Sequence, residues 1–246
     1  MTGFRRSVAV GCMLLAHTVH GSMLEAATVG EAYDLDSKEL LYRETHCVSA
    51  DAGIREVLYR DTDDELIAYK TLNYAPGSTT PSFEQHNLYS GDSIAVALRS
   101  GAVVVTTRDD SADGTGRSHT LTPSPASPLV IDAGFDAFVT DHWSSLVDGQ
   151  QQRFQFPLAA REALVELQIR SAPCTYPTQS DQCFRLAVDN WVLRLVADSI
   201  ELGYDAQSRR LTRFRGVSNI GDGSGGGMAV DIHYRYHDLA ALECAR

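Results

Sequence analysis

The stretch GFDAFVTDHWSSLVDGQ (residues 134–150) decides the fold, because it is the one segment with a clean helical period in a sequence otherwise typical of strands. Its apolar residues recur at the spacing of one helix face. They are Phe135, Phe138, Val139, Trp143, Leu146 and Val147. We therefore expect one amphipathic helix with a buried apolar face, with Asp132 or Gly134 as its N-cap and Gly149 at its C-terminal end.

The rest of the chain is typical of β-strands separated by turns. The acidic run DTDDE (61–65) and the pair Ser100-Gly101 both predict hairpin connections. The predicted strands are 39–48, 55–60, 66–74, 93–99, 102–108, 152–156, 163–171, 184–188, 191–201, 210–215 and 230–236. About ten strands and one helix predict a mainly β fold, a curved antiparallel sheet or half-barrel wrapped around one amphipathic helix.

The first 27 residues have the features of an export signal. Arg5 and Arg6 precede the apolar run 8–19, and small residues follow at 24–27. This run is too short to span a membrane, and no later stretch is long enough either. We expect residues 1–27 to be a signal peptide and residues 28–246 to be a single β-rich domain, periplasmic or secreted and not an integral membrane protein.

Charge and cysteines narrow the class further. A formal net charge of −11 argues against a nucleic-acid partner. Of the five cysteines, Cys12 falls within the predicted leader, and the four that remain predict two disulfides in an exported chain. Of the three possible pairings we favour the local pair Cys174–Cys183, which leaves Cys47 with Cys244. No CxxC or close His/Cys spacing supports a metal site instead.

Four segments resemble a known family. LLYRETH (40–46), VLYRDTDDELIAYKTLNY (57–74), DAGFDAFVTDHW (132–143) and GYDAQSRRLTRFRGVSNIGD (203–222) together are similar to exported, uncharacterised β-rich proteobacterial proteins, a domain of unknown function. The likeness covers most of the chain after the leader and implies no established activity. The element order also resembles lipoprotein-carrier-type half-barrels, in which a curved sheet wraps a helix around a hydrophobic cavity.

Two polar loops have the beginnings of known motifs. The loop DDSADGTG (109–116) matches the first half of a calcium loop, but Thr120 stands where the bidentate Glu belongs. The stretch GDGSGGG (221–227) lacks the Lys-Ser/Thr of a phosphate loop. We interpret both as hairpin connections and predict neither a metal nor a cofactor.

Strand 210–215 carries the one concentration of arginines. Arg213 and Arg215 share a face, together with Leu211. We expect these arginines to pair with carboxylates of neighbouring strands, and an anionic ligand is the alternative.

His142 interrupts the apolar stripe of the helix, so it marks where the helix meets water or ligand. We predict that an apolar or amphipathic small molecule or lipid binds between sheet and helix. The predicted ligand contacts are Phe138, His142, Trp143, Trp191 and Arg213. One alternative is a secreted hydrolase that uses His142 with Asp132 or Asp136. Another is an envelope module with a protein partner.

Overall fold

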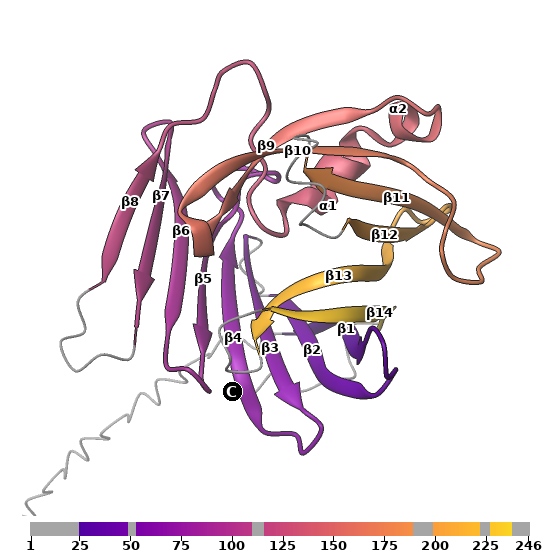
Figure 1. Ribbon diagram of the computed structural model, residues 1–246, viewed down its shortest axis with the longest axis horizontal. Coiled ribbons are helices and arrows are strands. Elements are labelled where there is room, and N and C mark those ends of the chain that lie inside the picture. The colour runs from indigo at the N-terminus through magenta and orange to yellow at the C-terminus, as the bar shows by residue number, and fades with distance from the viewer. Residues whose placement is uncertain (1–24, 49–52, 110–115, 189–198, 222–226, 238–246) are drawn as a thin grey trace, which may run out of the picture.

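The computed structural model describes residues 25–48, 53–109, 116–188, 199–221 and 227–237. These residues form one sheet of 14 antiparallel strands (Figure 1). The chain starts in the middle of the sheet at β1, runs outward to β8 at one edge, crosses through the helices to β9 at the other edge, and returns inward to β14 beside β1. A curved antiparallel sheet, as the sequence predicts, is thereby confirmed.

The bounds of the strands and helices follow the chain. They are β1 (Glu25–Asp34), β2 (Leu40–Val48), β3 (Ile54–Asp61), β4 (Leu66–Asn73), β5 (Ser82–Asn87), β6 (Ser93–Arg99), β7 (Ala102–Arg108), β8 (Arg117–Leu121), α1 (Gly134–Asp141), α2 (Trp143–Val147), β9 (Gln152–Leu158), the 3₁₀ turn η1 (Ala159–Arg161), β10 (Ala163–Ser171), β11 (Asp181–Val188), β12 (Ile200–Asp205), β13 (Leu211–Gly221) and β14 (Gly227–Tyr236).

Three strands are missing from the sequence prediction, namely β1, β5 and β8. The predicted strand 191–201 lies outside the described residues as far as residue 198 and shares only its last two residues with β12. The polar strand β5 follows a Pro/Gly-rich cluster, and β8 is exposed along nearly its whole length, so neither shows an apolar alternation. β1 begins at Glu25, inside the predicted leader, and the leader boundary stays a prediction.

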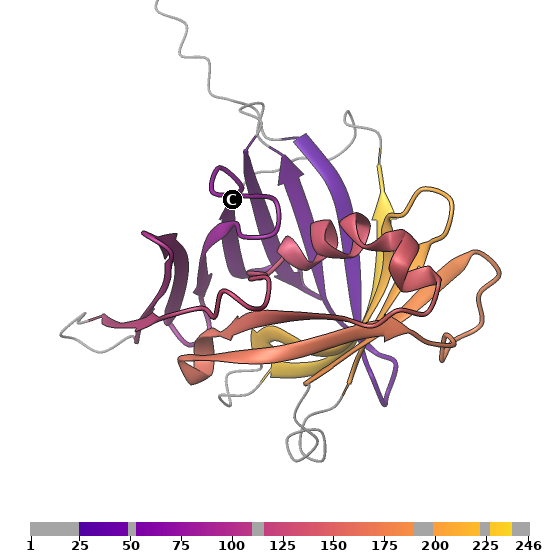
Figure 2. The same cartoon turned by 90° about the horizontal axis from the view of Figure 1, so that it is seen from above.

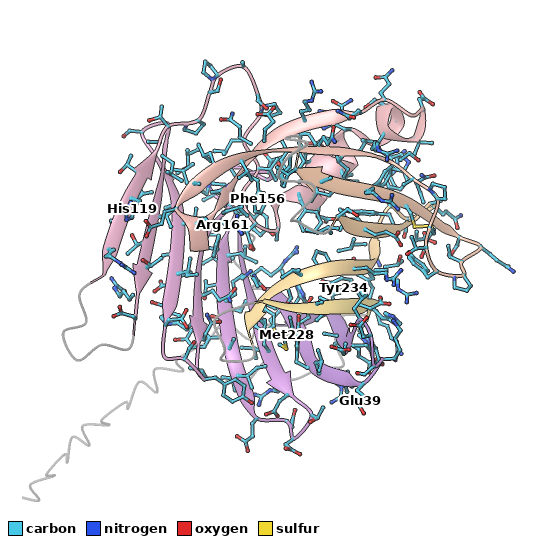
Figure 3. The ribbon with its side chains drawn as sticks, viewed as in Figure 1. Glu39, His119, Phe156, Arg161, Met228 and Tyr234 are labelled. Atoms are coloured by element: carbon cyan, nitrogen blue, oxygen red, sulfur yellow. A yellow bond between two sulfur atoms is a disulfide. The ribbon has the colours of Figure 1, made fainter. Side chains whose placement is uncertain are left out.

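The sheet curls until its two ends overlap. The turn between β9 and β10 lies against the inner side of β6 and β7, where Ala159 packs on the buried cluster of Val96, Val103 and Val105. An ion pair of 2.8 Å joins His119 Nε2 on β8 to Glu162 Oε2 beyond this turn. Figure 3 labels Arg161 at the turn and His119 on β8. Side chains, rather than a β-ladder, therefore hold this end of the half-barrel together.

Both helices lie inside the curve of the sheet (Figure 2). Their buried side chains, Phe138, Val139, Trp143 and Leu146, join one apolar cluster with residues of β9 to β13. The strand members of that cluster are Phe154, Leu167, Ile169, Phe184, Leu186, Leu202, Tyr204 and Leu211. Apolar burial on this scale, at about 25 cal/mol per Å², fixes the helices to one half of the concave face.

The predicted single helix is wrong in one respect, because it divides at His142. The His142 backbone N–H and its ring Nδ1 both donate to the Phe138 carbonyl oxygen, at 3.1 and 2.9 Å. The backbone of His142 adopts a φ of −102° and a ψ of 12°, outside the helical range, and this local departure separates α1 from α2. The N-cap residue is Ala133, and Val147 is exposed rather than buried. Gly149 ends the helical segment at a φ of 84°, as predicted.

The local disulfide Cys174–Cys183 is confirmed. Cys47 is fully buried on β2 and is disulfide-bonded, whereas Cys244 lies outside the described residues, so their pairing stays a prediction. Within the described ranges, no helix is long and apolar enough to cross a membrane.

Candidate ligand-binding site

The apolar face of the helices is filled by protein. Phe138 and Trp143 are only 2% and 7% exposed. Phe138 lies 4.7 Å from Phe154, and Trp143 lies edge-on to Phe184 at 5.5 Å and to Tyr204 at 5.9 Å, measured between ring centroids. These distances are those of well-packed aromatic pairs. The two predicted ligand contacts thus anchor the helices to β9–β13.

His142 lies at the edge of this packing. Its half-buried ring stacks on Phe138 at 4.2 Å, and its Nδ1–H is already bound to a backbone carbonyl. In the described part of the chain, no hydrogen bond or ion pair joins His142 to Asp132 or Asp136. The hydrolase alternative therefore lacks its acid–base pair.

Arg213 lies on the outer face of the sheet, away from the helices. The register pairs Leu202 with Phe214, and both side chains pack inward. The next pair is Gly203 with Arg213, so the Arg213 side chain points outward. A register shift beside Tyr204 turns Leu211 into the core, so the prediction that Leu211 shares a face with the arginines is wrong. Trp191 lies outside the described residues.

A polar cluster occupies the inner face of β2, β3, β4 and β14. We call it the inner polar cluster and define it as Tyr42, Glu44, His46, Tyr59, Lys70, Asp132 and Tyr234. Glu44 is buried, and its Oε1 lies 3.0 Å from His46 Nε2. Burial by itself raises the pKa of Glu44, but the hydrogen bonds with His46 and Tyr234 outweigh it and hold the pKa below its usual value.

Gly30 of β1 makes room for Glu44 and Tyr234. A Cβ on Gly30 would stand 2.7 Å from Glu44 Cγ and 2.9 Å from Tyr234 Cε1, closer than carbon atoms pack. Desolvation and the nearby Glu44 charge raise the pKa of Tyr234 well above its usual value, so the phenol stays protonated and donates to the carboxylate. Figure 3 labels Tyr234 on β14.

Lys70 links this cluster to the start of α1. Its buried ammonium lies 3.0 Å from both carboxylate oxygens of Asp132 and 5.2 Å from the Phe83 ring centroid. The Asp132 backbone adopts a φ of 44°, which a non-glycine residue rarely does. The predicted N-cap residue thus serves instead as an anchor between helix and sheet.

Asp136 projects from α1 toward β2, β3, β12 and β14. Its side chain is exposed, yet desolvation by the surrounding protein raises its pKa, while the nearby Tyr204 hydroxyl and the charges of Arg55 and His46 lower it. Burial is the main cause that raises the pKa of Tyr204 and of Tyr236, and the negative charge of Asp136 raises both further. The pKa of Tyr236 reaches about 12. The buried Tyr204 hydroxyl has no hydrogen-bond partner among the described atoms, so it faces Asp136 without hydrogen-bond geometry.

Most residues of the inner polar cluster are not among the site residues predicted from the sequence. Tyr42, Glu44 and His46 alternate along β2, so a period-2 reading of LLYRETH already places them on one face. Their position on the inside depends on the sheet curvature and on long-range pairing. Within the described ranges, no three His, Cys, Asp or Glu side chains are grouped to hold a metal ion.

Fold and site together define a mainly β, β-barrel-like domain of unknown function. The sequence matches no protein-family model and no curated protein. Among solved structures, it is similar to the β-barrel-like protein of the domain of unknown function DUF1849 from Brucella abortus. The TM-score is 0.52 at 10% identity, over 89% of this chain and 100% of that one. At this identity the likeness shows the fold alone.

Proposed function

We propose that this chain is an exported carrier or receptor that holds an amphipathic small molecule or lipid between α1 and the inner polar cluster. The observation that carries the proposal is Asp136, a carboxylate that is open to solvent and yet desolvated by protein around it. Its carboxylate is thus an accessible charge close to the cationic Arg55, an arrangement that can bind the polar head of a ligand. Beside it, Tyr204 keeps a buried hydroxyl unpartnered among the described atoms.

The proposed ligand lies on the flank of α1 opposite its packed aromatic face. Phe138 and Trp143 are engaged with β9–β13, and the other flank faces tyrosines and charged groups. The head of an amphipathic ligand would meet Arg55 and Asp136, and its apolar part would meet the half-buried Tyr74, whose ring centroid lies 5.5 Å from the Arg55 guanidinium carbon. Mixed lining of this kind fits an amphipathic molecule better than a purely apolar one.

Export and an oxidising compartment belong to the same proposal. The Cys174–Cys183 disulfide supports a location outside the reducing cytoplasm, periplasmic or secreted.

The experiment is native mass spectrometry with organic extraction, applied to protein purified from the periplasm. We expect a co-purifying amphiphile with the wild type and with Asp141→Trp, and loss of it with Asp136→Trp, which fills the space beside Tyr204. Asp141 is the control because it is exposed on the same helix. Wild-type protein that is repeatedly empty would refute the carrier, and a co-purifying protein would support the envelope-partner alternative.

A further inference from the structure

A groove of about 500 Å³ lies on the outer face of the sheet, on the side opposite the proposed ligand site. Lys38, Tyr176, Arg213, Arg215, Asp231 and His233 line it. Its volume is in the range of small-molecule sites in proteins. Because it is separated from the helices by the sheet, binding there is independent of the proposed carrier function.

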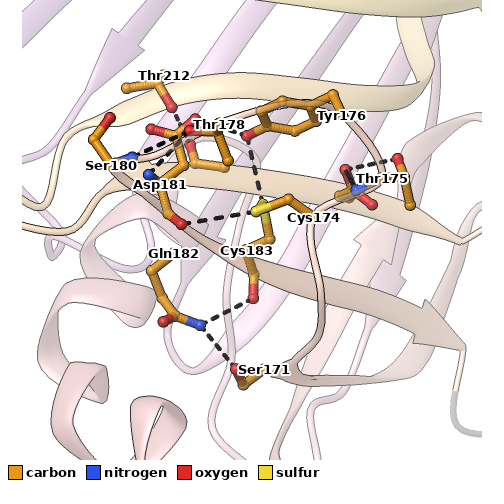
Figure 4. The surroundings of a disulfide bond; sticks show 12 residues. Ser171, Cys174, Thr175, Tyr176, Thr178, Ser180, Asp181, Gln182, Cys183 and Thr212 are labelled. Atoms are coloured by element: carbon orange, nitrogen blue, oxygen red, sulfur yellow. Dashed lines mark hydrogen bonds between the residues drawn. A yellow bond between two sulfur atoms is a disulfide. The ribbon is translucent and has the colours of Figure 1, made fainter.

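The roof of the groove is a fixed loop. The Cys174–Cys183 disulfide closes the loop, and the Tyr176 hydroxyl donates to Asp181 Oδ2 at 2.9 Å (Figure 4). Tyr176 lies over Gly203, where a Cβ would stand 1.8 Å from its hydroxyl oxygen. The Arg213 guanidinium carbon sits 4.0 Å from the Tyr176 ring centroid, a close cation–π contact. The lining is therefore preorganised rather than a chance depression between loops.

Positive charge exceeds negative charge in the groove. Arg213 binds Asp231 through two hydrogen bonds of 2.7 Å, and Arg215 lies 3.3 Å from Asp231 and 3.9 Å from Glu201. Lys38 donates to the Leu35 backbone carbonyl and has no ion pair within the described ranges. Among the residues that line the groove, the cations Lys38, Arg213 and Arg215 thus face one carboxylate, Asp231, while Glu201 and Asp34 lie behind Arg215 and Lys38.

Hydrogen-bond donors are also in surplus. Each guanidinium has five N–H donors, and Arg213 spends two of them on Asp231. Arg215 donates through Nη1 to the Thr175 hydroxyl, and its buried Nε has no partner with hydrogen-bond geometry among the described atoms. His233 adds no charge near neutral pH, because burial and the neighbouring Arg213 lower its pKa. Donors that outnumber acceptors favour a ligand that brings oxygen acceptors.

We propose that this groove binds a small organic anion, a carboxylate or phosphate attached to a flat apolar body. The anionic oxygens would meet Arg215 and Lys38, and the flat body would pack on Tyr176 and Pro177. Guanidinium groups recognise both kinds of oxyanion.

The test is an NMR titration of the whole protein with phenyl phosphate, benzoate and phenol as probes. We expect saturable shifts at the amides of 176 and 233, with phenyl phosphate or benzoate tighter than phenol by at least tenfold. The two anions distinguish phosphate from carboxylate preference.

The variants locate the site. Arg215→Gln should weaken the preferred anion at least tenfold, and Lys38→Gln, an exposed residue that supports no packing, about threefold. Arg117→Gln is the control, since Arg117 is exposed on β8, at the edge of the sheet away from the groove. Equal binding of phenol and the anions, shifts elsewhere only, or unchanged affinity in Lys38→Gln would overturn the proposal.

Discussion

The Lys70 ammonium lies 3.0 Å from both carboxylate oxygens of Asp132 and thereby ties strand β4 to the residue that precedes the N-cap of α1. Lys70 is 4% exposed, so the pair sits in a weakly polar environment. This contact holds the start of the helix over the inner polar cluster.

Replacing Lys70 with Met should destabilise the fold by about 3 kcal/mol, because it leaves the Asp132 carboxylate desolvated and unpaired. Urea unfolding measures the loss. Adding Asp132→Asn should recover a large share of it, since Asn has no charge and tolerates the positive φ of 44° at this position. A double variant whose loss equals the sum of the two single losses would contradict this role.

Gly203→Ala should cost about 2 kcal/mol, because the new methyl group would stand 1.8 Å from the Tyr176 hydroxyl oxygen. The loss should shrink when Tyr176→Phe is introduced into the same chain, since the clashing oxygen is then gone. Thermal unfolding of the four proteins forms the cycle. If Tyr176→Phe gives no relief, the loop does not lie on Gly203.

Asp136 predicts a specific dependence of stability on pH. An unfolded aspartate titrates at about pH 3.9, whereas desolvation raises the native pKa of Asp136. Below the unfolded pKa, both states are protonated and this carboxyl costs nothing. Between the unfolded and the native pKa, the carboxyl is ionised in the unfolded chain but still protonated in the native state. The free energy of unfolding therefore falls as the pH rises through the native pKa.

Asp136→Asn should therefore gain stability over the wild type as the pH rises, by less than about 1 kcal/mol at neutral pH because Asp136 is exposed and water screens its charge. Urea unfolding at a series of pH values measures this, with Asp141→Asn as the matched control on the same helix. A difference from the wild type that stays constant across the series would argue against a desolvated Asp136.

Removal of the local disulfide with Cys174→Ser and Cys183→Ser should lower the free energy of unfolding by about 2.5 kcal/mol, because the bond closes a short loop. The backbone amide chemical shifts of Tyr176, which belongs to this loop, and of Arg213, which the loop covers, should change. A variant with unchanged shifts there would show that hydrogen bonds alone hold the loop in place.

The fold class follows from the sequence because its signals are local. The alternation in strands β6, β7 and β10, the turn at Ser100-Gly101 and the helical stripe all depend on neighbours along the chain. Both turn residues adopt positive φ, as that hairpin requires. Strands β5 and β8 escape this reading because pairing with their neighbours, not their own pattern, makes them strands.

The candidate site is less visible in the sequence, since it depends on contacts between distant segments. Lys70 and Asp132 are 62 residues apart, and Asp136 meets side chains from four separate strands. Phe138 and Trp143 are predicted ligand contacts because they are apolar, and the same apolar character buries them in the core. Strand alternation, which is visible in the sequence, places Arg213 on the face opposite that of Phe214. The sequence does not show which of these two faces the helices cover, so it does not predict that Arg213 faces outward.

Titration with dodecanoic acid, below its critical micelle concentration, tests whether an amphipathic ligand binds beside Asp136. Amide shifts in the ¹⁵N-labelled protein report where the ligand binds. We predict saturable shifts at residues 55, 136, 204 and 234, which disappear in Asp136→Trp and persist in Asp141→Trp. Shifts confined to the outer face, or no saturable shifts at all, would exclude a ligand site beside Asp136.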